Sequence, residues 1–560
     1  MPPNSHPCRG RADLGCDRSS SGASRSTGRP NTLSTLLDRR LTWLAGANAH
    51  ALFEGRRLGL ERETLRVAPD GQISQIRHPP ALGAALTHPF ITTDYSEALL
   101  EFITPPLANA EEALRFLDEC HRLAYEHIGD ELLWAASMPC IVAGEASIPI
   151  AEYGASNLGL MKHIYRRGLA WRYGRIMQVI AGIHFNFSLP DIFWAAFQAH
   201  EREQSSLQDF RSGAYFGLIR NLQRFGWLIL YLFGASPAVC KSFLDGKSTA
   251  LPEFDDHTCY GPYATSLRMS NIGYTNRTEK KSGVNVCYNS LAEYIASLTQ
   301  ATVTPWPAYQ QIGVKVDGEY RQLNANILQI ENEYYTSMRP KQPPQDNEKP
   351  SLALQRRGVQ YVELRSLDLN PLDPLGTNSS QLRFLEAFLL LCLLHESPPL
   401  DAEERRINDD NQMAVALSGR DPRLILQCRH EPNLPLRQWG ARLLDQLAAI
   451  CDLLDGGEPG GSYALALAEQ RETLADPERT PSARILAEMR ASGENFFRCT
   501  RRLSEQHRAY FQAVPLASER RQFFTEAAAQ SWQKQRAIEA ADTLPFDEFL
   551  GRYFLADRQL

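Results

Sequence analysis

The chain has 560 residues, of which 43% are hydrophobic and 22% are charged, a composition typical of globular proteins. Its 59 basic and 65 acidic residues give a formal net charge of −6, which argues against nucleic-acid binding because that function requires a basic surface. The longest apolar runs, residues 227–233 and 387–394, are too short to cross a membrane.

The N-terminal segment, residues 1–32, is rich in Ser, Arg, Gly and Pro and nearly free of large apolar side chains. Such a segment cannot bury enough surface to order itself, so we expect a disordered extension. It has the arginine and serine content of an organelle-targeting peptide, which stays an alternative, but not the apolar centre of a secretory signal. Whether the mature protein contains this segment stays open.

The first patterned stretch is residues 59–67 (GLERETLRV). In a strand successive side chains point to opposite faces, so Glu61 and Glu63 share a face and Arg62 points the other way. Two neighbouring carboxylates repel each other unless a proton or a cation lies between them. The pattern therefore fits a solvated charged strand or, if partners lie nearby, a Mg²⁺ or Mn²⁺ site with oxygen ligands.

Four further stretches alternate in the same way and are predicted to be strands. Each places polar or charged side chains on one face. These stretches are residues 99–104 with Glu101, residues 182–189 with His184 and Asn186, residues 326–335 with Gln329, Glu331, Glu333 and Tyr335, and residues 359–365 with Tyr361, Glu363 and Arg365.

Helical periodicity fills most of the remaining chain. The predicted helices cover residues 33–52, 111–128, 165–180, 215–233, 381–394, 436–454, 463–474, 482–491 and 518–541. Residues 338–350 contain four prolines and several charges, which favours a flexible surface loop. From about residue 374 onward the pattern is helical only.

The eleven cysteines show no Cys-x-x-Cys pair and no repeated spacing. This distribution argues against a zinc cluster or a disulfide framework and favours a reducing compartment. We interpret Cys140, Cys240 and Cys392, each in an apolar neighbourhood, as small side chains that fill the core.

Together the strands predict an antiparallel sheet with helices on its apolar face and a polar, acid-lined concavity on the other. Crowded carboxylates require cations, and with Arg166, Arg268 and Arg365 they suit a polyphosphate held between divalent metals and guanidinium groups. The common phosphate-binding motifs are absent: Lys241 replaces the first glycine of a P-loop before residues 246–248.

Several motifs resemble the proteobacterial glutamate–cysteine ligase family (γ-glutamylcysteine synthetase). They are residues 59–66 (GLERETLR), 91–102 (ITTDYSEALLEF), 137–140 (SMPC), 263–268 (YATSLR), 273–276 (GYTN) and 361–368 (YVELRSLD). The resemblance extends from about residue 35 to residues 540–546. It implies an α+β fold, with a curved antiparallel sheet forming a funnel like the catalytic domain of glutamine synthetase. Residues 33–373 would be the catalytic region, and residues 374–560 a mainly helical region packed on it.

The resemblance also implies the reaction: ATP-dependent joining of the L-glutamate γ-carboxylate to the amine of L-cysteine through a γ-glutamyl phosphate, the first step of glutathione biosynthesis. Mg²⁺, or Mn²⁺, would serve as cofactor. The implied metal ligands are Glu61, Glu63, Asp94, Glu101, His184 and Glu363. Positions around the cysteine and γ-glutamyl groups are Tyr165, Leu169, Gln178, Tyr274 and Tyr335, and the arginines near the phosphates and the reacting carboxylate are Arg166, Arg268 and Arg365.

Two alternatives stay open on sequence alone. One is a related carboxylate–amine ligase that uses another amine or ammonia. The other is a metal- or nucleotide-binding module without activity, although the carboxylates and arginines that activity requires are present. We expect a cytoplasmic monomer that binds its small-molecule substrates and neither nucleic acid nor membrane.

Overall fold

The computed structural model describes residues 35–47, 49–273, 285–345, 348–429 and 432–555. The predicted extension 1–32 and Tyr274 lie outside these residues. The elements of the fold belong to one compact unit, Leu36–Leu560. The proposed division at residue 373 stays a prediction.

The strand predicted at residues 59–67 is confirmed and lies inside the main sheet. This sheet has seven strands, all pairs are antiparallel, and the order is β10-β11-β5-β1-β3-β2 with β4 paired to one end of β1. The strands are β1 (Arg57–Val67), β2 (Ile91–Thr93), β3 (Leu99–Ile103), β4 (Leu132–Leu133), β5 (Ile183–Ser188), β10 (Met338–Lys341) and β11 (Tyr361–Leu367). The predicted α+β fold with an antiparallel sheet is confirmed, and the sheet is open.

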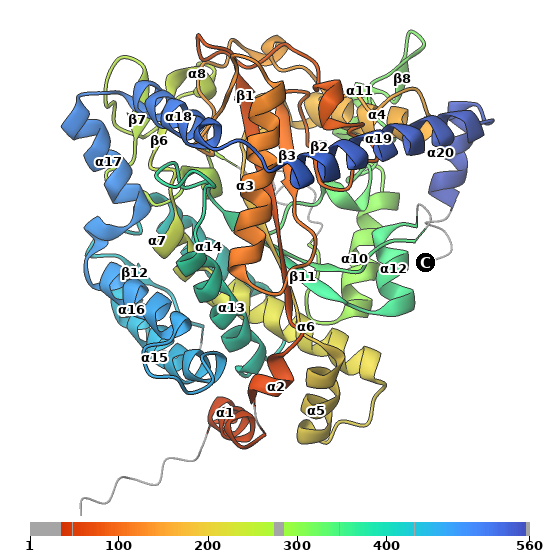
Figure 1. The fold of residues 1–560 in the computed structure, drawn as a ribbon. Coiled ribbons are helices and arrows are strands. Elements are labelled where there is room, and N and C mark those ends of the chain that lie inside the picture. Colours follow the sequence, from red (N-terminus) through yellow and green to blue (C-terminus); the bar gives the residue numbers. More distant parts are fainter. Residues whose placement is uncertain (1–34, 48, 274–284, 346–347, 430–431, 556–560) are drawn as a thin grey trace, which may run out of the picture. The chain divides into compact units, whose positions relative to one another are not determined.

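The helices before the last sheet strand are interleaved with it in sequence (Figure 1). They are α1 (Leu36–Gly46), α2 (Ala49–Phe53), α3 (Ala110–His127), α4 (Asn157–Tyr173), α5 (Asp191–Glu201), α6 (Leu207–Phe225), α7 (Trp227–Phe233), α8 (Lys241–Leu244), α10 (Leu291–Val303), α11 (Pro307–Ile312) and α12 (Pro350–Arg357). One predicted helix, residues 165–180, is shifted: α4 ends at Gly174, whose φ of 84° favours glycine, and a 3-10 turn, Ile176–Val179, follows.

The C-terminal part is mainly helical, as predicted, although a short strand pair lies within residues 425–435. Its helices are α13 (Ser379–Leu394), α14 (Ala402–Ser418), α15 (Leu436–Leu454), α16 (Ser462–Ala475), α17 (Pro481–Ser492), α18 (Phe496–Ala513), α19 (Ser518–Ala541) and α20 (Phe546–Leu555). Three short two-stranded sheets complete the fold: β6 (Ala238–Cys240) with β7 (Thr258–Tyr260), β8 (Lys315–Val316) with β9 (Glu319–Tyr320), and β12 (Ile425–Leu426) with β13 (Leu434–Pro435).

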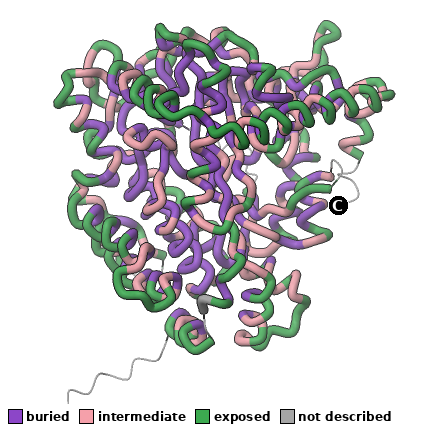
Figure 2. Tube along the Cα trace, viewed as in Figure 1, coloured by how far each residue is buried: buried purple, intermediate pink, exposed green. Residues whose placement is uncertain are grey.

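The apolar face of the sheet packs on helices: α3 contacts β1 and β3, α7 contacts β11, and α6 contacts β10. Leu60, Phe185 and Leu364 from three neighbouring strands are fully buried there. In Figure 2 the tube is accordingly coloured as buried in the interior of the molecule. Helix α13, which is buried on nearly all sides, belongs to the same core. This packing fixes the sheet and leaves its other face for polar side chains.

The helix-covered face is less apolar than predicted, because it contains two arginines. Arg62 is buried against His121 of α3, and Arg66 forms a buried ion pair with Glu131 (Nη1 to Oε2, 2.6 Å). Buried guanidinium groups are tolerated where such partners satisfy them. Period-two alternation places these side chains on the helix side but does not reveal their partners.

Two predictions near residue 335 are wrong. Residues 326–335 do not form a strand; a 3-10 turn, Glu331–Glu333, lies there instead. The stretch predicted to be a flexible loop begins with β10, which pairs with β11. Pro340 is tolerated because β10 is an edge strand, where a missing N–H group need not break a ladder.

The interpretation of Cys140 and Cys240 as core filler is also corrected. Both are buried, but they are joined by a disulfide with a Cα–Cα distance of 5.5 Å. Their separation of 100 residues leaves no spacing signal that sequence reasoning can detect. Cys392 is a buried free cysteine, as predicted. Among the described residues no helix combines the length and apolarity of a membrane span.

The acid sensitivity of the fold can be predicted from His88. Its imidazole is buried and accepts hydrogen bonds at Nδ1 from the backbone N–H groups of Phe90 (3.1 Å) and Ile91 (2.8 Å). Burial lowers the pKa of His88 to about 4. An unfolded histidine titrates near 6.5, so below about pH 6.5 the unfolded chain binds more protons and stability falls until about pH 4.

We expect the free energy of unfolding to fall between about pH 7 and pH 5, with His88 contributing up to about 2 kcal/mol of the loss. Urea unfolding at both pH values measures it. His88→Gln, which does not titrate, should show a correspondingly smaller loss. An equal loss in the variant and the wild type would contradict this assignment.

Candidate functional site

Strand register creates a cluster of carboxylates on the polar face of the sheet. Glu63 of β1 lies directly opposite Glu101 of β3, and Glu61 lies opposite His184 of β5. On the next strand, Glu363 lies opposite Asn186. Like charges placed opposite each other destabilise a sheet, so this register requires a compensating charge or function.

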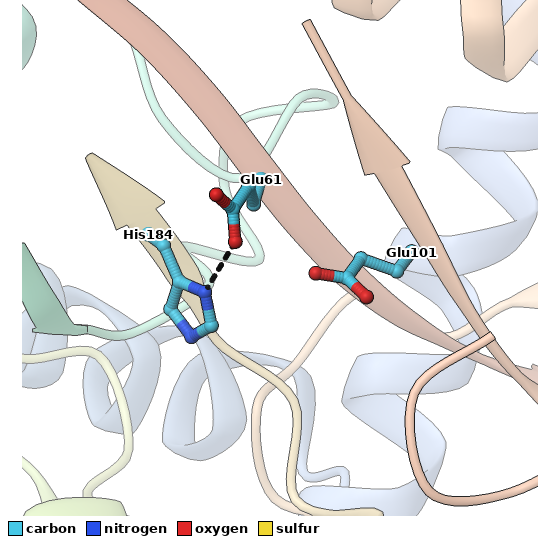
Figure 3. Close-up of side chains that lie close together, drawn as sticks. All are labelled: Glu61, Glu101 and His184. Atoms are coloured by element: carbon cyan, nitrogen blue, oxygen red, sulfur yellow. Dashed lines mark hydrogen bonds and ion pairs between the residues drawn. The ribbon is translucent and has the colours of Figure 1, made fainter. Parts of the chain in front are cut away.

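The closest group is Glu61, Glu101 and His184, whose potential ligand atoms all lie within 4.8 Å of one another (Figure 3). The Nδ1 atom of His184 is 3.0 Å from Oε2 of Glu61, and Asn186 donates to Oε1 of Glu61 at 2.9 Å. Burial and then the charge of Arg365 lower the pKa of His184, which favours the neutral ring. If Nδ1–H donates to Glu61, the lone pair of Nε2 is available to a ligand.

On the acidic side of the cluster, burial and neighbouring negative charges disfavour ionisation of the carboxylates. Burial, followed by the charge of Asp94, raises the pKa of Glu63 to about 8. Burial and the charges of Glu61 and Asp94 raise the pKa of Glu101 well above its ordinary value. These carboxylates therefore favour a bound cation that would allow them to ionise together.

The other side of the cluster is basic. Arg365 and Lys341 lie 3.1 and 3.3 Å from Oε1 of Glu363. Burial alone would raise the pKa of Glu363, but the charges of Lys341 and Arg365 outweigh it and hold this pKa well below its ordinary value. The second oxygen of Glu363, Oε2, is buried without a hydrogen-bond partner. Such an oxygen suits a metal ion, because an unsatisfied buried acceptor costs free energy.

Arg268 and Arg365 are coupled through the backbone. Arg268 donates Nη2–H to the carbonyl oxygen of Arg365 (3.0 Å) and lies 3.8 Å from Asp368. Gly182 packs against this guanidinium and donates its N–H to Oε2 of Glu63 (2.8 Å). Arg166 lies on α4, stacks on Tyr153 at 4.6 Å and donates to the carbonyl oxygen of Asp94 (2.5 Å).

The remaining predicted residues differ in how the structure connects them to this cluster. Tyr165 lies on α4, directly before Arg166. Asp94 is close enough for its charge to act on Glu63 and Glu101. Tyr335 donates to the sulfur of Met269, next to Arg268, at 3.3 Å. Leu169 is buried in the hydrophobic core, and Gln178 is buried in the turn after α4.

Sequence reasoning missed the basic residues of β10. Arg339 pairs with Glu363 in register and donates to the carbonyl oxygens of Asn332 (2.9 Å) and Tyr334 (2.5 Å). Lys341 is on the same face. The alternation in residues 338–341 was the available signal, and the neighbouring prolines obscured it.

The family model for glutamate-cysteine ligase matches residues 41–415. The chain belongs to the glutamate–cysteine ligase family. A member from Alcanivorax borkumensis is 48% identical over 523 residues, covering 92% of this chain and 99% of that protein. One from Pseudomonas aeruginosa is 49% identical over 521 residues, covering 93% and 98%.

Solved structures agree with the family. A glutamate–cysteine ligase from Francisella tularensis, crystallised in complex with AMP, matches with a TM-score of 0.84 and 34% identity over 90% of this chain and 98% of that one. A bifunctional glutathione synthetase from Pasteurella multocida matches with a TM-score of 0.65 and 26% identity, covering 84% of this chain and 55% of that one. The resemblance to glutamate–cysteine ligases that was drawn from the sequence motifs is thus confirmed.

Gly182 offers a test of how closely the site is packed. A Cβ atom there would lie 2.1 Å from Nη2 of Arg268. We expect Gly182→Ala to displace that guanidinium and lower kcat by about 100-fold, the usual scale for an ångström-sized misplacement. Steady-state kinetics measures the loss, and circular dichroism should show an intact fold.

The matched control is Gly213→Ala, because a Cβ atom on this exposed helical glycine of α6 meets nothing within 4 Å. It should leave activity unchanged and stabilise slightly. Equal activity of both variants would contradict the expectation that activity depends on where the Arg268 guanidinium lies.

Proposed function

We propose that this chain catalyses the reaction for which its family is named. The enzyme forms an amide bond between the γ-carboxylate of L-glutamate and the amine of L-cysteine, and it converts ATP to ADP and phosphate. The product is γ-glutamylcysteine, and this reaction is the first step of glutathione biosynthesis. The observation that best supports this proposal is the acid cluster of Glu61, Glu63 and Glu101 beside Arg365 on one sheet face. Family membership over nearly the whole chain supports it independently.

The site fits divalent cations. Ligand atoms of Glu61, Glu101 and His184 lie within reach of one ion, and Oε2 of Glu363 lacks a partner. Carboxylates with one imidazole suit Mg²⁺ or Mn²⁺. We propose that six residues share the bound ions: Glu61, Glu63, Asp94, Glu101, His184 and Glu363. When bound, the ions would neutralise the phosphate oxygens of ATP.

The arginines supply the second part of the mechanism. A carboxylate is a poor electrophile, so the γ-carboxylate of glutamate first attacks the γ-phosphorus of ATP, giving γ-glutamyl phosphate and ADP. We assign Arg268 and Arg365 to the charge on the transferring phosphoryl group, and Arg166 to the reacting carboxylate. In GTPases an arginine in such a role contributes about 10³–10⁵ in rate.

The amine of cysteine then attacks the acyl phosphate, and phosphate leaves. The amine must lose a proton, and a carboxylate of the cluster is the natural acceptor. Water must be excluded, because it would hydrolyse the acyl phosphate. We assign Tyr165, Leu169, Gln178 and Tyr335 to positions around the amino-acid substrates, with Tyr274 expected there from the family motif.

Substrate choice is tested by measuring ADP release from purified protein with Mg²⁺, ATP and L-glutamate. L-Cysteine is compared with ammonia and other small amines, and the product is identified by mass. We expect γ-glutamylcysteine only with cysteine. Turnover with another amine alone would move the protein to a neighbouring class of carboxylate–amine ligase, and no turnover from folded protein would contradict the enzyme proposal.

The metal assignment is tested by Glu61→Ala in the same assay. Loss of a ligand should reduce activity at least about 100-fold, since even outer-shell changes cost 10–100-fold, and higher Mg²⁺ concentrations should restore it in part. The control is Glu54→Ala, which removes an exposed carboxylate just before β1. Full activity of Glu61→Ala would contradict the assignment.

We further propose that the protein works as a cytoplasmic monomer on these small substrates alone, without nucleic acid or membrane. The formal charge of −6 supports the absence of a nucleic-acid partner. Sedimentation of the purified protein tests the oligomeric state.

A further inference from the structure

A cavity of about 700 Å³ has a lining separate from the acid cluster, although one lining residue, Tyr153, donates a hydrogen bond to the backbone carbonyl oxygen of Asp94. Its walls come from the turn Pro80–Leu82, the C-terminal end of α3 and helix α19, which is blue in Figure 1. None of the candidate ligase residues lines it. Cavities of this size accept small organic molecules.

The buried charged side chains that line the cavity are acidic. Glu97 and Glu131, both more than nine-tenths buried, line it. Arg66 binds Oε2 of Glu131, but Oε1 of Glu131 is shielded from solvent and has no hydrogen-bond partner. A buried carboxylate oxygen in this state loses solvation without compensation, so it favours a ligand that donates a hydrogen bond.

The local charges favour a cation. The oxygens of Glu97 accept only backbone N–H groups, from His78 at 2.8 Å and Glu152 at 2.9 Å. Arg66 pairs with the carboxylate of Glu131 but reaches only the backbone carbonyl oxygen of Glu97 (2.9 Å), and no ion pair among the described residues involves the Glu97 carboxylate. Burial, followed by the charges of Arg66 and His88, lowers the pKa of His78 to about 4, so this ring adds no positive charge near neutral pH. The arginine that lines the cavity, Arg77, is exposed and pairs with the exposed Glu152.

Apolar and aromatic side chains, among them Pro79, Ile128 and Trp532, line other parts of the wall. The indole N–H of Trp532 is already donated to the carbonyl oxygen of Pro80 (3.0 Å), which holds the ring in place. An indole face attracts both apolar groups and cations. The wall therefore complements a molecule with an apolar body and one positive charge.

We propose that this cavity is a second binding site, for a small organic monocation with an apolar or aromatic body. The ammonium group contacts Oε1 of Glu131, and the body packs against Trp532. Neither contact involves the acid cluster, so binding needs no ATP, metal or amino-acid substrate.

The probe is phenethylamine, compared with the neutral 2-phenylethanol and the anionic phenylacetate by calorimetry and ligand-detected NMR on the full chain. We expect one binding site for phenethylamine, at least about tenfold weaker binding of the alcohol, and none of the acid. Equal binding of all three probes would overturn the proposal, as would no binding of phenethylamine.

Variants locate the site. Glu131→Gln and Trp532→Ala should each weaken phenethylamine binding at least about tenfold. Because Glu131→Gln disturbs Arg66, Trp532→Ala keeps the test informative if the first variant does not fold. Phe523→Ala removes another aromatic side chain from α19 that does not line the cavity and should bind normally.

The acid cluster is a competing place for an amine, and Glu61→Gln separates the two. Retained affinity in Glu61→Gln, together with loss in Trp532→Ala, supports the cavity. Loss in Glu61→Gln with normal binding in Trp532→Ala would overturn it. Failure of the ligase assay would leave this result unaffected.

Discussion

The register of β1 between β3 and β5 is the constraint on which the site depends. It places Glu63 against Glu101 and Glu61 against His184, an arrangement that repulsion and desolvation both disfavour. The cost is tolerated because the opposite face of the same strands is anchored in the hydrophobic core, where Leu60 and Phe185 are fully buried. A slip of one residue would exchange the two faces, so core packing and site assembly are specified together.

Charge changes sign across this face. The β3 side gathers carboxylates whose pKa values are raised, whereas β11 and the edge strand β10 bring Arg365, Arg339 and Lys341 around Glu363. Such a gradient suits an anionic phosphate chain, with cations bound between it and the acids on one side and guanidinium groups on the other. The disfavoured electrostatics of the carboxylate cluster and its proposed chemistry thus have the same origin.

Sequence alternation predicted the strands that contain Glu61, Glu101, His184 and Glu363, because each has one face in the core and therefore a strict period of two. The same reasoning failed where alternating residues do not belong to a strand that packs on the core: residues 326–335 alternate but contain a 3-10 turn and no strand. The proline in the edge strand β10 favours a loop, so the sequence does not predict this strand. Long-range partners, such as Cys240 for Cys140 or Glu131 for Arg66, are fixed only by the tertiary fold.

The central claim is that the acid cluster is a divalent-metal site. Its most direct test is a crystal structure of the wild-type protein soaked with Mn²⁺ and measured for anomalous scattering. The account predicts a peak between the carboxylates of Glu61 and Glu101 and the ring of His184. Strong Mn²⁺ peaks elsewhere on the protein, with none at this position, would contradict it.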